Sequence, residues 1–130
     1  MVKILLATLA VFVEWAALDM VVHGVILQSS YEATAQLWRP MEEMKMGLIY
    51  FTNLVTAFVF SFLYGKLVGT KGLKIGLYYG LLFGLAFGIP MGYGSYASMP
   101  IPYNMALTWF LGSFVEALLA GLLVGLIIKK

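Results

Sequence analysis

Four ionisable residues and one asparagine interrupt otherwise apolar stretches of this 130-residue sequence. Asp19 and His23 are four residues apart, so a helix places them one turn apart on one face. A carboxylate beside an imidazole can bind a cation or exchange a proton. Glu14 and Glu116 can do the same chemistry, either separately or as a carboxyl pair that shares one proton. The predicted ion- or proton-binding set is Asp19, His23, Glu14, Glu116 and Asn53.

The spacing of the two acids in the first apolar stretch divides this set. Glu14 and Asp19 are five residues apart, which turns their side chains about 140° away from each other around a helix. We therefore expect Asp19, His23 and Asn53 to form an internal site, with Glu14 facing a cleft or a neighbouring subunit. In a second interpretation, the Asp19–His23 pair only orients the following loop beside Arg39.

Methionines near the start of the second apolar stretch suggest a different chemistry. Met41, Met44 and Met46 give a Met-x-x-Met and a Met-x-Met spacing. Thioether sulfur is a soft ligand that selects Cu(I), so Met44, Met46 and His23 are candidate metal ligands. Flexible packing of the methionines is the alternative. His23 is the only histidine and there is no cysteine, so thiolate sites and a bis-histidine haem within one chain are excluded, and the cofactor stays unknown.

The composition indicates the elements that must position these residues. The chain is 62% hydrophobic and 11% charged, less than half of the roughly 25% charge of a soluble domain. Each of four apolar stretches is long enough to cross about 30 Å of hydrocarbon, and lipid requires such segments to be helical. The sequence predicts an all-α polytopic membrane protein whose single four-helix domain occupies residues 1–130. The expected spans are 4–27, 46–68, 72–89 and 103–128, with outer loops 28–45 and 90–102.

The basic residues predict the orientation of the helices. All but two of the eight Lys and Arg residues fall on one side of the predicted bundle, and the exceptions are Arg39 and Lys45 in loop 28–45. Because cytoplasmic loops are enriched in basic residues, both termini should be inside. We expect a multi-pass protein of a bacterial inner membrane. The basic residues on the inner side are Lys3, Lys66, Lys71, Lys74, Lys129 and Lys130.

Glycine recurs at every fourth position of the third apolar stretch, and the fourth stretch carries a matching row of small residues. Such rows let helix backbones approach closely in lipid, as in a glycine zipper. The sequence predicts a glycine-packed helical bundle, with the partner helix either in the same chain or in another copy. The residues expected at this packing are Gly76, Gly80, Gly84, Gly88, Gly121 and Gly125.

Acidic side chains in the middle of a membrane cost about 2.5–3.5 kcal/mol each, so they indicate a function inside the bundle or at an interface. We expect a small proton- or cation-linked transporter or channel that works as an oligomer. The alternatives are a non-catalytic accessory subunit of a larger membrane complex and an outward-facing Cu(I)-binding protein. No nucleophile or nucleotide-binding motif is present, which favours a protein that is not an enzyme. The small net charge of +2 does not indicate nucleic acid, so the expected partners are the lipid bilayer, further copies or a larger membrane complex.

Overall fold

The computed structural model describes residues 1–129, apart from the side chain of Met41. The described chain is 85% helical and has no strands, which confirms the prediction of an all-α protein. The elements in chain order are α1 (Val2–Val21), the π-helical turn η1 (Val22–Ile26), α2 (Gln28–Ala33), the 3-10 turns η2 (Ala35–Leu37) and η3 (Met41–Glu43), α3 (Met46–Leu67), α4 (Leu73–Ile89), the π-helical turn η4 (Pro90–Gly94), α5 (Ser95–Ser98) and α6 (Tyr103–Ile127).

Four continuous helical segments are long and apolar enough to cross a membrane. Large apolar side chains are exposed on all of them, as expected of helices that face lipid rather than water. These segments indicate a multi-pass membrane protein, as the composition predicts. They run over Val2–Ile26, Met46–Leu67, Leu73–Ser98 and Tyr103–Ile127.

The third segment extends beyond its predicted end at residue 89. Pro90 has no N–H for the regular helical bond, which is why the sequence suggests a helix end there. In the structure Pro90 begins the π-helical turn, and the helix continues to Ser98. The wider π turn absorbs the missing bond without redirecting the chain. The predicted outer loop 90–102 is therefore mostly helical, and only residues 99–102 connect α5 to α6.

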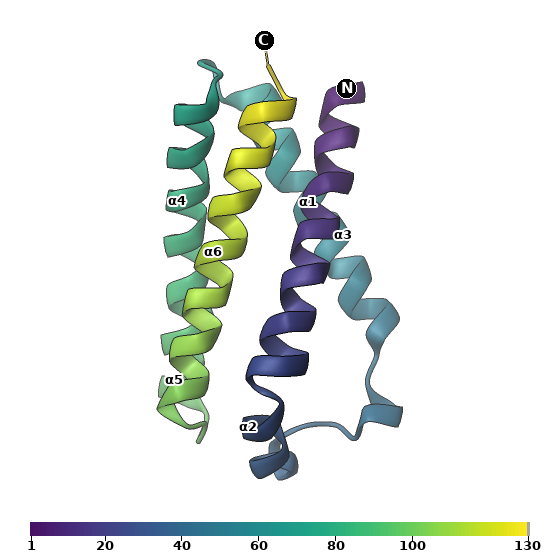
Figure 1. The fold of residues 1–130 in the computed structure, drawn as a ribbon, viewed down its shortest axis with the longest axis vertical. Helices are drawn as coiled ribbons and strands as arrows, with labels where there is room; N and C mark the ends of the chain where they lie inside the picture. Colours follow the sequence, from purple (N-terminus) through teal and green to yellow (C-terminus); the bar gives the residue numbers. More distant parts are fainter. Residues whose placement is uncertain (130) are drawn as a thin grey trace.

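The helices form an open bundle in which α4 and α6 lie side by side along their whole length (Figure 1). Helix α1 packs against both α6 and α3. Helix α3 lies close to α1 near the chain termini and diverges from it towards the opposite end (Figure 1). Both termini lie at the same end of the bundle as the α3–α4 turn, and the small helices α2 and α5 lie at the other end.

Backbone atoms of both helices take part in the contact between α4 and α6. Gly76, Gly80, Gly84 and Gly88 are all buried on α4. A Cβ atom built on Gly80 would lie 2.5 Å from the carbonyl oxygen of Ala117 and 3.0 Å from the Cα of Gly121 on α6. These distances leave no room for a side chain at Gly80. The helix that lies against this row therefore belongs to the same chain.

Two apolar clusters hold the bundle together, one towards each end. The first joins α1, α3 and α6 near the termini, and the second joins η1 and the residue after it to the start of α6. The short segment of α1 between Trp15 and Val22 lies between the two clusters and contains Asp19. The buried residues of the first cluster are Ile4, Ala7, Val11, Trp15, Ala57, Phe60, Tyr64, Ala120, Val124 and Ile128, and those of the second are Val22, Leu27, Ile101, Met105 and Ala106.

Candidate proton- or ion-binding site

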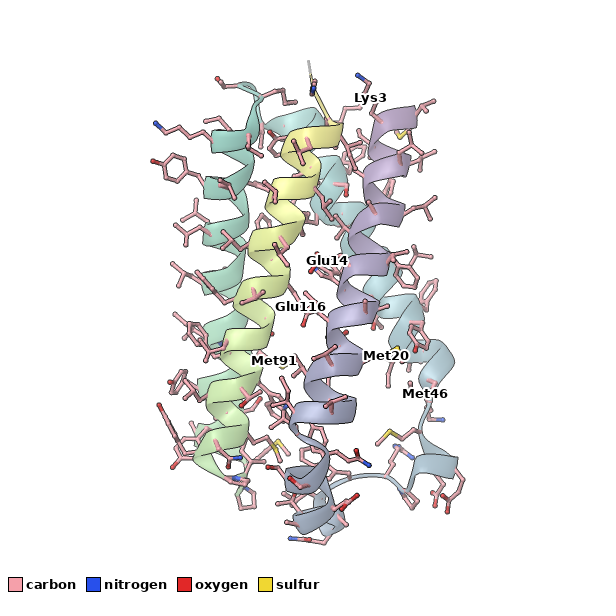
Figure 2. The ribbon with its side chains drawn as sticks, viewed as in Figure 1. Lys3, Glu14, Met20, Met46, Met91 and Glu116 are labelled. Carbon is pink, nitrogen blue, oxygen red and sulfur yellow. The ribbon has the colours of Figure 1, made fainter. Side chains whose placement is uncertain are left out.

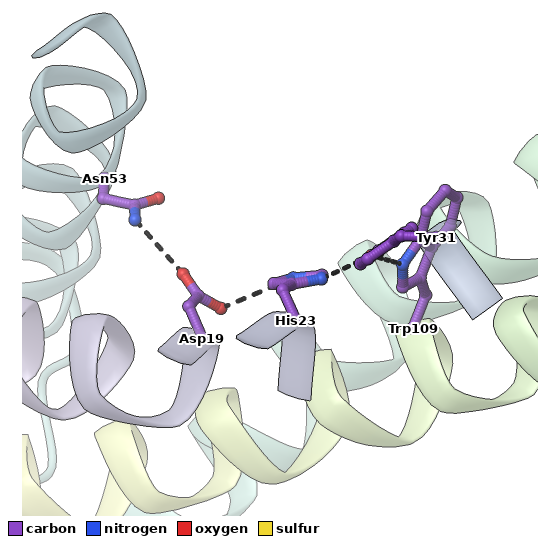
Figure 3. Close-up of polar contacts among 5 residues, drawn as sticks. All are labelled: Asp19, His23, Tyr31, Asn53 and Trp109. Carbon is purple, nitrogen blue, oxygen red and sulfur yellow. Dashed lines mark hydrogen bonds and ion pairs between the residues drawn. The ribbon is translucent and has the colours of Figure 1, made fainter. Parts of the chain in front are cut away.

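Asp19 and His23 lie one turn apart, Asp19 on α1 and His23 in the π-helical turn that follows it (Figure 3). The Nε2 atom of His23 is 4.0 Å from the Oδ1 atom of Asp19. Asn53 on α3 donates from its amide Nδ2 to the other oxygen of Asp19, Oδ2, at 3.3 Å. The structure thus brings together the three residues expected to form the internal site. The Asp19 side chain is 31% exposed and that of His23 is 44% exposed, so the site opens to the surface of the single chain.

Tyr31 on α2 extends this set of contacts away from the middle of the bundle. Its phenol oxygen is 2.5 Å from the Nδ1 atom of His23, and the two rings stack with centroids 5.8 Å apart. Trp109 on α6 donates its indole N–H to the same phenol oxygen at 2.7 Å. Figure 3 shows the resulting chain of polar contacts from Asn53 through Asp19, His23 and Tyr31 to Trp109.

One arrangement of protons satisfies every group in this chain. The indole of Trp109 can only donate, so the Tyr31 oxygen accepts from it and keeps its own proton to donate. His23 Nδ1 then accepts from the Tyr31 hydroxyl, and the imidazole proton sits on Nε2. This places the Nε2–H opposite the Asp19 carboxylate, where opposite partial charges attract.

The Tyr31 hydroxyl stays protonated at neutral pH. Desolvation by burial raises the pKa of this phenol above its ordinary value of 10, although the hydrogen bond from Trp109 opposes the shift and the negative charge of Asp19 adds to it. Tyr31 is therefore a hydrogen-bond donor over the physiological range.

An aromatic cluster surrounds the outer end of the polar chain. The Trp38 ring meets the Tyr31 ring edge to face at 5.5 Å and the Trp109 ring at 6.0 Å. The Trp38 indole donates to the Thr34 hydroxyl at 2.9 Å. Sequence reasoning missed Tyr31 and Trp109 as site residues. They are eight and 86 positions from His23 along the chain, and no local spacing links them. The one local signal was an ionisable pair placed shortly before Tyr31.

Glu14 and Glu116 face each other from neighbouring helices. Figure 2 shows both side chains directed into the space between α1 and α6. Asp19 and Glu14 are the acidic neighbours of the Glu116 carboxyl group. The indole of Trp15 also donates to the main-chain oxygen of Glu116 at 3.0 Å, which ties α1 to α6 at this level. Glu116 thus lies near both acids of α1, although these two leave the helix in different directions.

The Glu14 carboxyl group is buried without a partner among the described residues. Neither of its oxygens accepts a hydrogen bond, and both are shielded from the surface. Other atoms of Glu14 line a shallow groove of about 380 Å³ between α1 and α6. Glu14 was expected to face a cleft or a neighbouring subunit; its carboxyl oxygens are buried, and only its other atoms line this groove. The remaining lining residues are apolar: Ala10, Val13, Leu119, Leu122 and Leu123.

The candidate copper ligands lie on separate elements. Met44 and Met46 are exposed near the beginning of α3, whereas His23 makes its polar contacts with Asp19 and Tyr31. Within residues 1–129, no three His, Asp or Glu side chains gather in a way that could hold a metal ion.

No protein-family model, curated protein or solved structure matches this chain. Its fold is that of a small all-helical protein with four candidate membrane spans. Within that class, this chain carries ionisable side chains inside two of its candidate spans: Glu14, Asp19 and His23 in the first and Glu116 in the fourth.

Proposed function

We propose that this protein conducts or transports protons across a membrane. The observation that carries the proposal is a series of neighbouring ionisable side chains that leads from Glu14 and Glu116 past Asp19 and His23 to Tyr31. Ionisable residues inside a membrane are costly, and proton relays built of carboxyl and imidazole groups are a common reason for keeping them. The series starts in the middle of the bundle and ends at the loop side, as a half-pathway for protons would.

The two ring nitrogens of His23 allow it to accept a proton on one side and release a proton on the other. A proton that arrives at Nδ1 from the Tyr31 hydroxyl allows the proton on Nε2 to leave towards Asp19, and the phenol is reprotonated from the aqueous side. The 4.0 Å between Nε2 and Oδ1 exceeds a direct hydrogen bond, so this step needs a small side-chain rotation or one bridging water. Asp19 then exchanges its proton with Glu116, which lies near Glu14.

The proposal includes an orientation. Lysines gather at the end of the bundle that holds the termini and the α3–α4 turn, and this end would face the cytoplasm of a bacterial cell. Tyr31 and the aromatic cluster would then face outward. In this arrangement the polar series connects the outer surface to the middle of the membrane.

We also propose that the working unit is an oligomer. Asp19 and His23 are partly exposed on a single chain, and contact with lipid would cost each charged group a few kcal/mol. The outer half of α3 beside them carries exposed apolar side chains and diverges from α1 (Figure 1). A second copy packed on this side would cover the polar groups, whereas the α4–α6 contact is already satisfied within one chain.

The test is proton flux into liposomes that contain the purified protein and a trapped pH-sensitive dye. We expect a proton flux above that of empty liposomes, lost in both Asp19→Asn and Glu116→Gln, which keep the side-chain volume but cannot ionise. Glu32→Gln is the matched control, because Glu32 is an exposed acid in α2 and its variant should conduct normally. Helicity measured by circular dichroism should be equal in all four proteins. Flux that persists in both Asp19→Asn and Glu116→Gln, or wild-type flux no faster than that of empty liposomes, would contradict the proposal.

A further inference from the structure

A second feature lies at the opposite end of the bundle from the aromatic cluster and is independent of the proposed proton pathway. A groove of about 520 Å³ opens between the beginning of α4 and the end of α6. Two lysines and four small or apolar residues line it. They are Lys71, Gly72, Leu73, Gly125, Leu126 and Lys129.

The α3–α4 turn that shapes this groove is held by a buried tyrosine. The Tyr64 side chain on α3 is fully buried, and its hydroxyl donates to the carbonyl oxygen of Gly72 at 3.1 Å and accepts from the Gly72 N–H at 3.3 Å. Gly72 has a φ of +134°, a backbone conformation that residues other than glycine rarely adopt. The two hydrogen bonds to Tyr64 and the glycine conformation therefore fix the shape of the turn.

Lys71 is held at the mouth of the groove. Its ammonium group lies 5.4 Å from the centroid of the Tyr64 ring and donates to the carbonyl oxygen of Val68. An ammonium group has three donors, and two remain for a ligand. Lys129 lines the other wall of the groove and is exposed, so the two charges flank the opening from the α3–α4 turn and from the residues that follow α6.

Within residues 1–129, no acidic side chain lies at this end of the bundle. The acidic residues lie either in the middle of the bundle or in the loop region at the far end. An anion held between Lys71 and Lys129 would therefore be a ligand from outside the described residues. The acidic residues are Glu14, Asp19, Glu32, Glu42, Glu43 and Glu116.

The walls of the groove indicate what kind of anion fits. Leu73 and Leu126 line it and are both exposed, so apolar surface continues from the lysines towards the membrane interior. A free inorganic anion would gain nothing from these leucines, whereas an amphiphile would place acyl chains on them. We infer that this groove binds an anionic phospholipid, with the headgroup phosphate between Lys71 and Lys129 and the acyl chains along Leu73 and Leu126.

The experiment measures lipid binding to the purified full chain by native mass spectrometry in detergent, with phosphatidylglycerol or phosphatidylcholine added. We expect the chain to retain phosphatidylglycerol in preference to phosphatidylcholine. Lys71→Gln with Lys129→Gln should weaken phosphatidylglycerol binding by about 30-fold, as expected for two lysines near an anionic headgroup. The matched control is Arg39→Gln with Lys45→Gln, which removes the same charge at the far end and should bind as the wild type does.

Two further measurements keep the inference testable. Lys129→Gln alone leaves the Lys71 contacts with Val68 and Tyr64 intact, and it should still weaken phosphatidylglycerol binding about fivefold in a protein of unchanged thermal stability. Excess inorganic phosphate should not displace the lipid. Equal retention of the two lipids, an equal effect of the two double variants, or displacement by inorganic phosphate would each overturn the inference.

Discussion

The indole N–H of Trp109 and the phenol oxygen of Tyr31 are 2.7 Å apart, and this contact joins α6 to the short helix α2 at the end of the bundle opposite the termini. The same phenol oxygen contacts His23. Tyr31 therefore links His23 to Trp109 on α6. The contact also aligns the phenol, because an oxygen that accepts from the indole directs its own proton elsewhere.

Removal of the Tyr31 hydroxyl tests this connection. Tyr31→Phe should keep the ring stacking with His23 but slow proton flux in liposomes at least severalfold, since Nδ1 loses its hydrogen-bond partner. The expected loss of stability is about 0.5–1.5 kcal/mol, the usual net worth of a hydrogen bond. Tyr96→Phe is the control, because Tyr96 is exposed on α5. Equal flux in the two variants would remove Tyr31 from the pathway.

The pKa of Tyr31 predicts how stability responds to alkaline pH. Burial raises this pKa in the folded protein, so the folded state holds the phenol proton more tightly than the unfolded state does. The stabilising contribution is complete below the ordinary pKa near 10 and is lost as pH rises through the folded-state value. We expect the melting temperature to fall more steeply above pH 10 in the wild type than in Tyr31→Phe. Parallel curves for the two proteins would show that Tyr31 does not contribute.

Substitution of Gly80 tests the backbone contact between α4 and α6. In Gly80→Ala the new Cβ would lie 2.5 Å from the carbonyl oxygen of Ala117, so the helices must separate, at an expected cost of about 1–3 kcal/mol. Gly47→Ala is the matched control on α3, because a Cβ there meets nothing within 4 Å. Thermal unfolding in detergent should show a lower melting temperature for Gly80→Ala alone. A melting temperature that matches that of Gly47→Ala would mean that the helices are less closely packed.

Introduced cysteines test the proposed oligomer. The native chain has no cysteine, so a single engineered thiol reports one position only. Val55→Cys on the exposed face of α3 should form disulfide-linked dimers in membranes on mild oxidation. Leu82→Cys on α4 should not, although Leu82 is 64% exposed and Val55 only 44%. Dimers at Leu82 but not at Val55 would place the interface on α4, and dimers at neither would favour the single chain.

Local features of the sequence predicted much of this molecule. The apolar stretches gave four helices because lipid admits no other open-chain structure. The four-residue spacing of Asp19 and His23 placed them together because one helical turn does so. The π-helical turn at Pro90 was not predicted, since a proline is read locally as a helix end and the wider turn that absorbs it depends on continued packing of Gly92 against Ala106.

The rest of the site was decided by tertiary structure. Glu116 comes near Glu14 and Asp19 only because α6 packs on α1. Tyr31 meets Trp109 only because the short helix α2, which follows α1 in the chain, lies against α6. These contacts join residues that are up to 102 positions apart in the sequence, and no helical period relates such positions. The sequence by itself determined that the chain forms four long apolar helices and which residues share one face of a helix. How the helices pack, and therefore which ionisable groups touch, was determined by the shapes of the side chains and glycines along their contacts.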